Sequence, residues 1–281
     1  MAAKLQGPVA HHFNNLNQQL STVRMGMWLF LVTEILFFGG AFCAYTAYRV
    51  WYPRDFEAGS AALNVGIASV NTFLLLTSSL TITLAIRCVY TNNRSGTKNY
   101  LLATIILGTA FLCLKAREYQ LDYHEGLIPN VSTLTPEAAK TVAERIKADP
   151  SKVDEKVYPF NENLAVVLHH TKVYKGQPGV DYDPYRVQLF FMFYYSLTGL
   201  HVLHMVIGLG LLAWQYILAR QGFFDYSARY IYIETMSLYW HFVDMAWMFL
   251  LPLLYLAGPH TASQAIEQFK DAIGLATGAS H

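Results

Sequence analysis

The sequence predicts an all-α, polytopic membrane protein with five transmembrane helices. Three observations support this fold class. The 281 residues are 54% hydrophobic and only 14% charged, whereas soluble domains average roughly 45–50% and 25%. The apolar residues are gathered into five blocks of membrane-crossing length. These blocks are continuous rather than alternating, which argues against the strands of a membrane β-barrel.

The first element is an inner N-terminal segment, residues 1–24, which is polar and lacks the apolar run of a cleavable signal. The first transmembrane helix is predicted over residues 25–48, where Glu34 is the only charged residue. A bilayer core of about 30 Å takes about 20 helical residues, so this block is long enough. We expect it to act as an uncleaved anchor.

Four further helices follow the same reasoning. The third block is uncharged as far as Leu114 and reaches full length only with its polar end included, and the fifth contains Glu234, His241 and Asp244. The predicted ranges are 63–86, 100–119, 187–218 and 230–257.

The third and fourth helices are separated by an extended polar insertion, residues 120–186, which is predicted to be mostly loop on the outer side. A short helix is expected within it, because Thr135 can cap a helix that has Pro136 at its first position. The remaining residues, 258–281, form an outer C-terminal tail.

Lysine and arginine in the short flanks predict the orientation, because they are enriched on the inner side of membranes. Seven of these residues flank one side and three flank the other, which places the N-terminus inside and the C-terminus outside. The inner group is Lys4, Arg24, Arg87, Arg94, Lys98, Arg220 and Arg229, and the outer group is Arg49, Arg54 and Lys270.

Ionisable residues inside a membrane are costly and are therefore candidates for function. Glu34 could transfer protons, or it could be a protonated carboxyl that hydrogen-bonds within the bundle. His201 and His204 share a helix face. His204 and His241, on different helices, could ligate a haem, and helix-to-helix hydrogen bonds or lipid contacts are the alternative.

Other classes of function are disfavoured. The net charge of +1 excludes the basic excess of a nucleic-acid-binding protein. The sequence contains no CxxC, HExxH, P-loop or GxSxG motif. We therefore expect neither a metal site nor a catalytic residue in this chain.

Four stretches of the sequence are informative together, namely RMGMWLFLVTEILFFGGAF, LKAREYQ, TGLHVLHMVIG and YWHFVDMAWMFL. In their order and spacing they resemble subunit III of the haem–copper cytochrome c oxidases. The N-terminal HHFNNLNQQ resembles bacterial members, so we expect the five-helix form without the two additional N-terminal helices of mitochondrial-type members. Residues from about Val131 to Tyr185 depart from the family pattern.

The resemblance implies a subunit without haem or copper of its own that packs against catalytic subunit I, supports proton uptake and binds phospholipid. Glu34 aligns with the family's embedded glutamate, which is implied to influence proton or oxygen access. The resemblance also implies lipid-binding or helix-packing roles for polar residues of the last two helices, namely His201, His204, Arg220, Glu234, His241 and Asp244.

The predicted function is thus an accessory subunit of a proton-pumping aerobic terminal oxidase in the bacterial inner membrane. Its partners would be subunit I, other oxidase subunits and lipid, with haems and copper held by the partners. Membership of a larger respiratory assembly stays open. The alternatives are subunit III of a quinol oxidase, a b-type cytochrome, and a small transporter coupled through Glu34.

Overall fold

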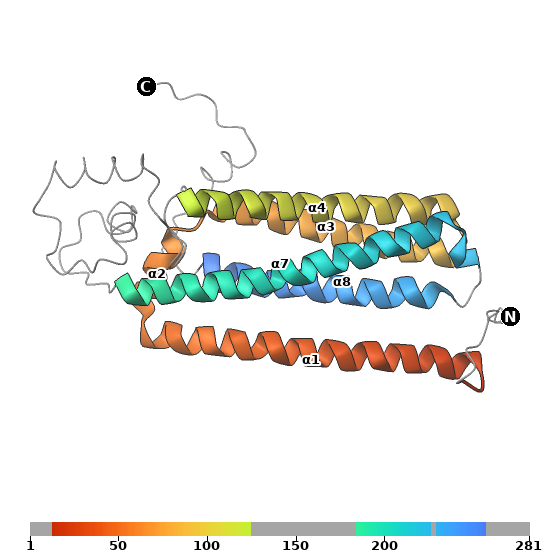
Figure 1. Ribbon diagram of the computed structural model, residues 1–281, viewed down its shortest axis with the longest axis horizontal. Helices are drawn as coiled ribbons and strands as arrows, with labels where there is room; N and C mark the ends of the chain where they lie inside the picture. The colour runs from red at the N-terminus through yellow and green to blue at the C-terminus, as the bar shows by residue number, and fades with distance from the viewer. Residues whose placement is uncertain (1–12, 125–183, 226–228, 257–281) are drawn as a thin grey trace, which may run out of the picture. The chain divides into compact units, whose positions relative to one another are not determined.

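The structure is a computed structural model that describes residues 13–124, 184–225 and 229–256. Almost all of these residues are helical and none of them forms a strand. Five helices are long and apolar enough to cross a membrane, namely α1, α3, α4, α7 and α8, so the predicted fold class is confirmed. Figure 1 labels the α-helices. In chain order the elements are α1 (Leu16–Trp51), α2 (Pro53–Ala61), α3 (Val65–Tyr90), α4 (Arg94–His124), α7 (Pro184–Arg220), η2 (Phe223–Asp225), α8 (Tyr230–Leu250) and the π-helix η4 (Leu251–Tyr255).

Three of the long helices, α1, α4 and α7, extend beyond both ends of the apolar blocks that predicted them. α1 begins at Leu16 rather than at residue 25, because the Asn15 side chain caps it by accepting the Gln18 amide at 2.8 Å. α4 runs to His124 and so includes the first residues of the predicted insertion. The short helix predicted after Thr135 and the tail 258–281 lie outside the described residues.

Asparagine and glycine set the tight turns between helices. Asn92 adopts a left-handed backbone conformation (φ 56°) directly after α3, a common way for a helix to end. Asn93 then caps α4, since its Oδ1 accepts the Gly96 amide at 2.9 Å. Gly222 (φ 71°) plays the corresponding role after α7.

Contacts divide the described residues into two units, and every membrane-length helix contributes a part to each. Unit 1 consists of residues 13–42, 72–112, 199–225 and 229–249. Unit 2 consists of residues 43–71, 113–124, 184–198 and 250–256.

The centre of unit 1 is the buried indole of Trp240 on α8. A Cβ added to Gly108 on α4 would lie 2.8 Å from this ring, and one added to Gly208 on α7 would lie 3.1 Å from it. The indole Nε1 donates to Ser78 Oγ on α3 at 3.0 Å. Two glycines therefore form a socket for Trp240, which joins four helices, as expected of small residues in membrane bundles.

The centre of unit 2 is aromatic and includes the short helix α2, which the hydropathy pattern does not reveal. Phe56 of α2 packs edge-to-face against Phe190 of α7, with ring centroids 5.6 Å apart. Gly59 of α2 lies so close to the Phe190 ring that any side chain there would clash. The connection between α1 and α3 is thus part of the packed core.

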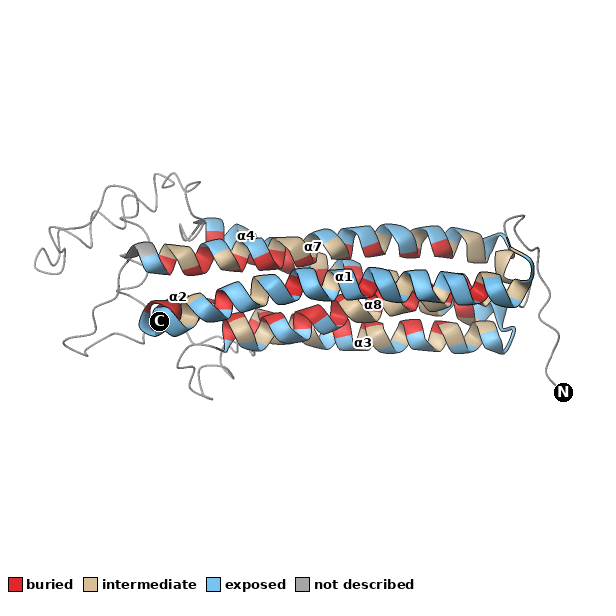
Figure 2. Cartoon of the chain, turned by 90° about the horizontal axis from the view of Figure 1, so that it is seen from below, coloured by how far each residue is buried: buried red, intermediate tan, exposed pale blue. Residues whose placement is uncertain are grey.

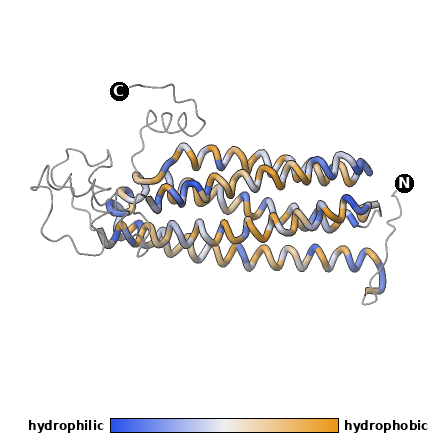
Figure 3. The backbone as a smooth tube through the Cα atoms, turned by 45° about the horizontal axis from the view of Figure 1, so that its top comes forward, coloured by the Kyte–Doolittle hydropathy of each residue, from blue (hydrophilic) through white to orange (hydrophobic). Residues whose placement is uncertain are grey.

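Of the five spans, α1 is the least covered. Only 11% of its most apolar 18-residue window is buried, against 50% for α8. Figure 2 shows most of α1 in the colour of exposed residues, and Figure 3 shows hydrophobic residues recurring along its length. An apolar, exposed surface of this kind is suited to lipid or to other membrane subunits.

Candidate functional sites in the membrane helices

Glu34 and His204 form a hydrogen-bonded pair between α1 and α7. Glu34 Oε2 lies 3.1 Å from His204 Nε2, and His204 Nδ1 lies 2.8 Å from the Leu200 carbonyl. A carbonyl only accepts hydrogen bonds, so Nδ1 carries a proton. One further proton must therefore lie between Nε2 and Oε2, either on a neutral glutamic acid or on an imidazolium facing a carboxylate. The pair is a half-buried site that holds a single shared proton.

An aromatic ring and a tyrosine hydroxyl contact His204 beside this pair. The Phe38 ring lies edge-on to the His204 ring at 5.2 Å. Tyr239 of α8 donates to the His204 carbonyl at 3.0 Å. The Phe38 ring and the bonds to Glu34 and Leu200 thus orient the imidazole, while Tyr239 ties the His204 backbone to α8.

Glu234 anchors a second polar contact of α1. Arg24 Nη2 donates to Glu234 Oε2 at 3.0 Å and to Tyr230 Oη at 3.2 Å. The guanidinium is about two-fifths exposed, so this ion pair contributes at most about 1 kcal/mol. Its role here is to fix the start of α1 against α8.

His241 bonds to α3, and Asp244 lies one turn further along α8. The Ser79 hydroxyl lies 2.8 Å from His241 Nδ1, and the Thr83 hydroxyl lies 3.4 Å from Nε2. Asp244 is buried within the described part of the chain.

The two remaining candidates lie in contrasting places. His201 is fully buried, with its ring 5.6 Å from that of Phe111 and 5.2 Å from that of Trp247. Arg220 is exposed in the last turn of α7.

His204 and His241 have both ring nitrogens in hydrogen bonds to protein groups. A haem-ligating histidine needs one ring nitrogen for the iron, so this arrangement disfavours the haem-ligating alternative.

A further polar cluster lies in unit 2, where the sequence suggested only the polar end of a helix. Lys115 and Glu118 of α4 are both buried and form an ion pair at 3.1 Å. The hydroxyls of Tyr194 on α7 and Tyr255 on η4 complete the cluster. The LKAREYQ stretch contains the signal, since Lys115, Glu118 and Tyr119 occur at helical spacing on one face.

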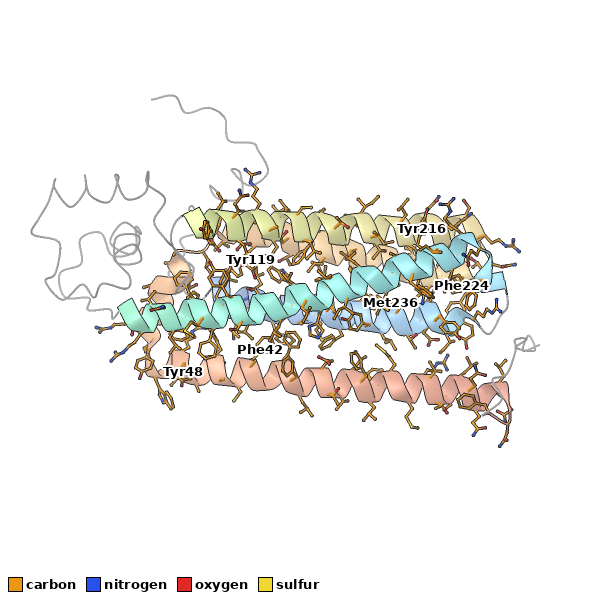
Figure 4. All side chains as sticks on the ribbon, in the orientation of Figure 1. Phe42, Tyr48, Tyr119, Tyr216, Phe224 and Met236 are labelled. Carbon is orange, nitrogen blue, oxygen red and sulfur yellow. The ribbon has the colours of Figure 1, made fainter. Side chains whose placement is uncertain are left out.

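Two hydrogen bonds extend this cluster between α4 and α7. Tyr119, labelled in Figure 4, donates to Thr198 at 2.6 Å, and Tyr195 donates to the buried Asp122 at 3.2 Å. Within the described part of the chain, no three His, Cys, Asp or Glu side chains come together as metal ligands would. The polar contacts described here thus join helices to one another, and the Glu34–His204 pair also holds a proton.

Known proteins with similar sequences support one family. A model of the family described as "Cytochrome c oxidase subunit III" matches residues 7–124 and 187–259, which include all or nearly all of each membrane-length helix. The matched ranges lie on either side of the segment that departs from the family pattern.

Individual relatives agree with this match. The probable cytochrome c oxidase subunit 3 of Rickettsia bellii (strain RML369-C) is 26% identical over 253 residues, covering 84% of this chain and 69% of the relative. The cytochrome c oxidase subunit 3 of Pelomedusa subrufa is 29% identical over 257 residues, covering 88% of this chain and 73% of the relative. The chain therefore belongs to the cytochrome c oxidase subunit III family.

Proposed function

We propose that this chain is the non-redox subunit III of a proton-pumping aerobic oxidase that passes electrons from cytochrome c to oxygen. It would stabilise catalytic subunit I and support proton uptake there, while haems and copper reside in partner subunits. One observation carries the proposal, namely that the family match includes membrane-length helices on both sides of the insertion. Members of this family are accessory subunits that act with other oxidase subunits in a membrane complex.

The placement of the site residues supports roles in packing and proton holding. Glu34 is hydrogen-bonded to His204. Its alignment with the embedded glutamate of the family supports a role in modulating proton or oxygen access near subunit I, without being an essential proton carrier. Glu234 and His241 bond to neighbouring helices. Arg220 is exposed in the last turn of α7, where its guanidinium would bind a phospholipid phosphate.

The proposed location is the bacterial inner membrane, with the N-terminus inside and the C-terminus outside. The distribution of charge supports this orientation. Six of the seven basic residues assigned to the inner side are described, and all six belong to unit 1, namely Arg24, Arg87, Arg94, Lys98, Arg220 and Arg229.

Purification through a tag on this chain tests the proposed function. We expect a haem–copper subunit to co-purify with it, and we expect the chain purified alone to show no visible absorption. A reduced b-type haem band in stoichiometric amount in the isolated chain would contradict the proposal. So would transport activity of the isolated chain in vesicles, which the transporter alternative predicts. A quinol-oxidase partner would be recognised by oxidation of quinol rather than of cytochrome c.

Glu34→Gln is expected to leave assembly and the metal centres of the complex intact. Glutamine is a neutral isostere whose amide can donate to His204 Nε2, so the change should cost no more than about one net hydrogen bond, about 1 kcal/mol. The measurement is the haem spectrum and subunit content of the purified complex. Glu57→Gln, at an exposed position of α2, is the matched control. Loss of the haem spectra in the Glu34 variant alone would show that the pair has another role.

A further inference from the structure

The buried cluster in unit 2 satisfies every polar atom it contains. Lys115 Nζ has three hydrogens, and it donates to Glu118 Oε2 at 3.1 Å, to Tyr194 Oη at 3.0 Å and to Tyr255 Oη at 2.6 Å. Both tyrosine hydroxyls in turn donate to Glu118 Oε1, at 2.9 and 2.6 Å. This closed network of hydrogen bonds depends on Tyr255, because its hydroxyl accepts one hydrogen bond from the lysine and donates one to the glutamate.

Tyr255 lies at the end of the only π-helical segment among the described residues, η4. Pro252, in the first turn of this segment, has no N–H to donate to the preceding turn of α8. A π-turn holds about one more residue than an α-turn, so it changes the direction of the following side chains by about 100°.

A second contact holds this turn. Tyr45 of α1 is fully buried, and its hydroxyl donates to the Leu253 carbonyl at 2.7 Å. Both groups belong to unit 2. A backbone carbonyl inside η4 is thus bonded to a side chain of another helix, and this bond ties the turn to α1.

We infer that Pro252 is a register-setting residue whose π-turn, held by Tyr45, seats the Tyr255 hydroxyl in the Lys115–Glu118 ion pair. In an uninterrupted α-helix Tyr255 would point about 100° away. The lysine would then lose an acceptor and the glutamate a donor, both inside a buried site where such losses are costly. The inference is independent of the proposed role in the oxidase, because it concerns only contacts within this chain.

Nitration of tyrosine by tetranitromethane in the purified complex, read by peptide mass spectrometry, tests this inference. Pro252→Ala should raise the nitration of Tyr255 at least about fivefold, the factor in protection that corresponds to one net hydrogen bond. Tyr194, in the same cluster but on α7, should stay within about twofold of the wild type, since its own hydrogen bond persists. A register change predicts this difference, whereas general loosening would expose both tyrosines.

Two further variants complete the test. Pro53→Ala, at the first turn of α2, is the matched control and should leave Tyr255 protected. Tyr45→Phe removes the bond to Leu253 and should also raise the nitration of Tyr255, which decides the matter if Pro252→Ala does not assemble. Protection of Tyr255 in both Pro252→Ala and Tyr45→Phe would overturn the inference. Equal exposure of Tyr194 and Tyr255 would overturn it as well.

Discussion

Lys115→Met is expected to destabilise the subunit by about 3–5 kcal/mol, because it leaves the buried Glu118 carboxylate without its cation. Both side chains are at most 2% exposed, so water cannot replace the lost partner. The measurement is the denaturant midpoint of the subunit in the purified complex. Lys98→Met, at a more exposed position of α4, should change the midpoint little.

The double variant Lys115→Met/Glu118→Leu should recover much of this loss. Removal of both charges abolishes the cost of an unpaired buried ion, and the hydroxyls of Tyr194 and Tyr255, 3.2 Å apart, can then bond to each other. A double variant that is as unstable as Lys115→Met alone would show that the ion pair is itself strongly favourable, whereas a loss equal to the sum of the two single losses would show that the two side chains contribute independently.

Trp240→Ala is the second change with a large expected effect, about 3 kcal/mol or more of lost stability. The indole fills the space above Gly108 and Gly208 and bonds to Ser78, and all of these contacts disappear together. Lipid chains are as apolar as the lost side chain, so the loss comes from packing and from the hydrogen bond rather than from hydration.

The change in denaturant midpoint caused by Trp240→Ala can be compared with the change caused by Trp214→Ala, which removes a 64% exposed tryptophan of α7. We expect the Trp214 variant to stay close to the wild type in denaturant midpoint. Equal losses in the two variants would contradict the role of the glycine socket. Enlarging a socket residue, as in Gly108→Ala, should also destabilise, since the new methyl would lie 2.8 Å from the indole.

The number and class of the helices could be predicted from the sequence because hydropathy responds directly to burial in a bilayer. Their lengths could not, since the first turns of α1 are polar and depend on the Asn15 cap. The helix α2 was not predicted, because a segment of nine largely polar residues gives no hydropathy signal. Helix ends and short helices that depend on local hydrogen bonds are thus harder to predict from the sequence than the membrane-crossing segments.

The site residues show a similar division. Glu34 and His204 were identified separately as embedded polar residues, but their pairing depends on how α1 and α7 pack and cannot be seen in a single chain. Lys115 and Glu118 looked like the polar end of a helix, whereas tyrosines from two distant segments bury them. Long-range partners decide whether a charge at a helix end is solvated or buried.

The hydrogen bonds between the end of α4 and the beginning of α7 have a practical consequence. Tyr119 bonds to Thr198 and Asp122 bonds to Tyr195, so the two helix ends are held together by their own side chains. The segment that connects the two helices is therefore not needed to hold their ends together. This position is therefore suited to the grafting of tags or foreign domains, and it is a place where related proteins can differ in length without disturbing the membrane part.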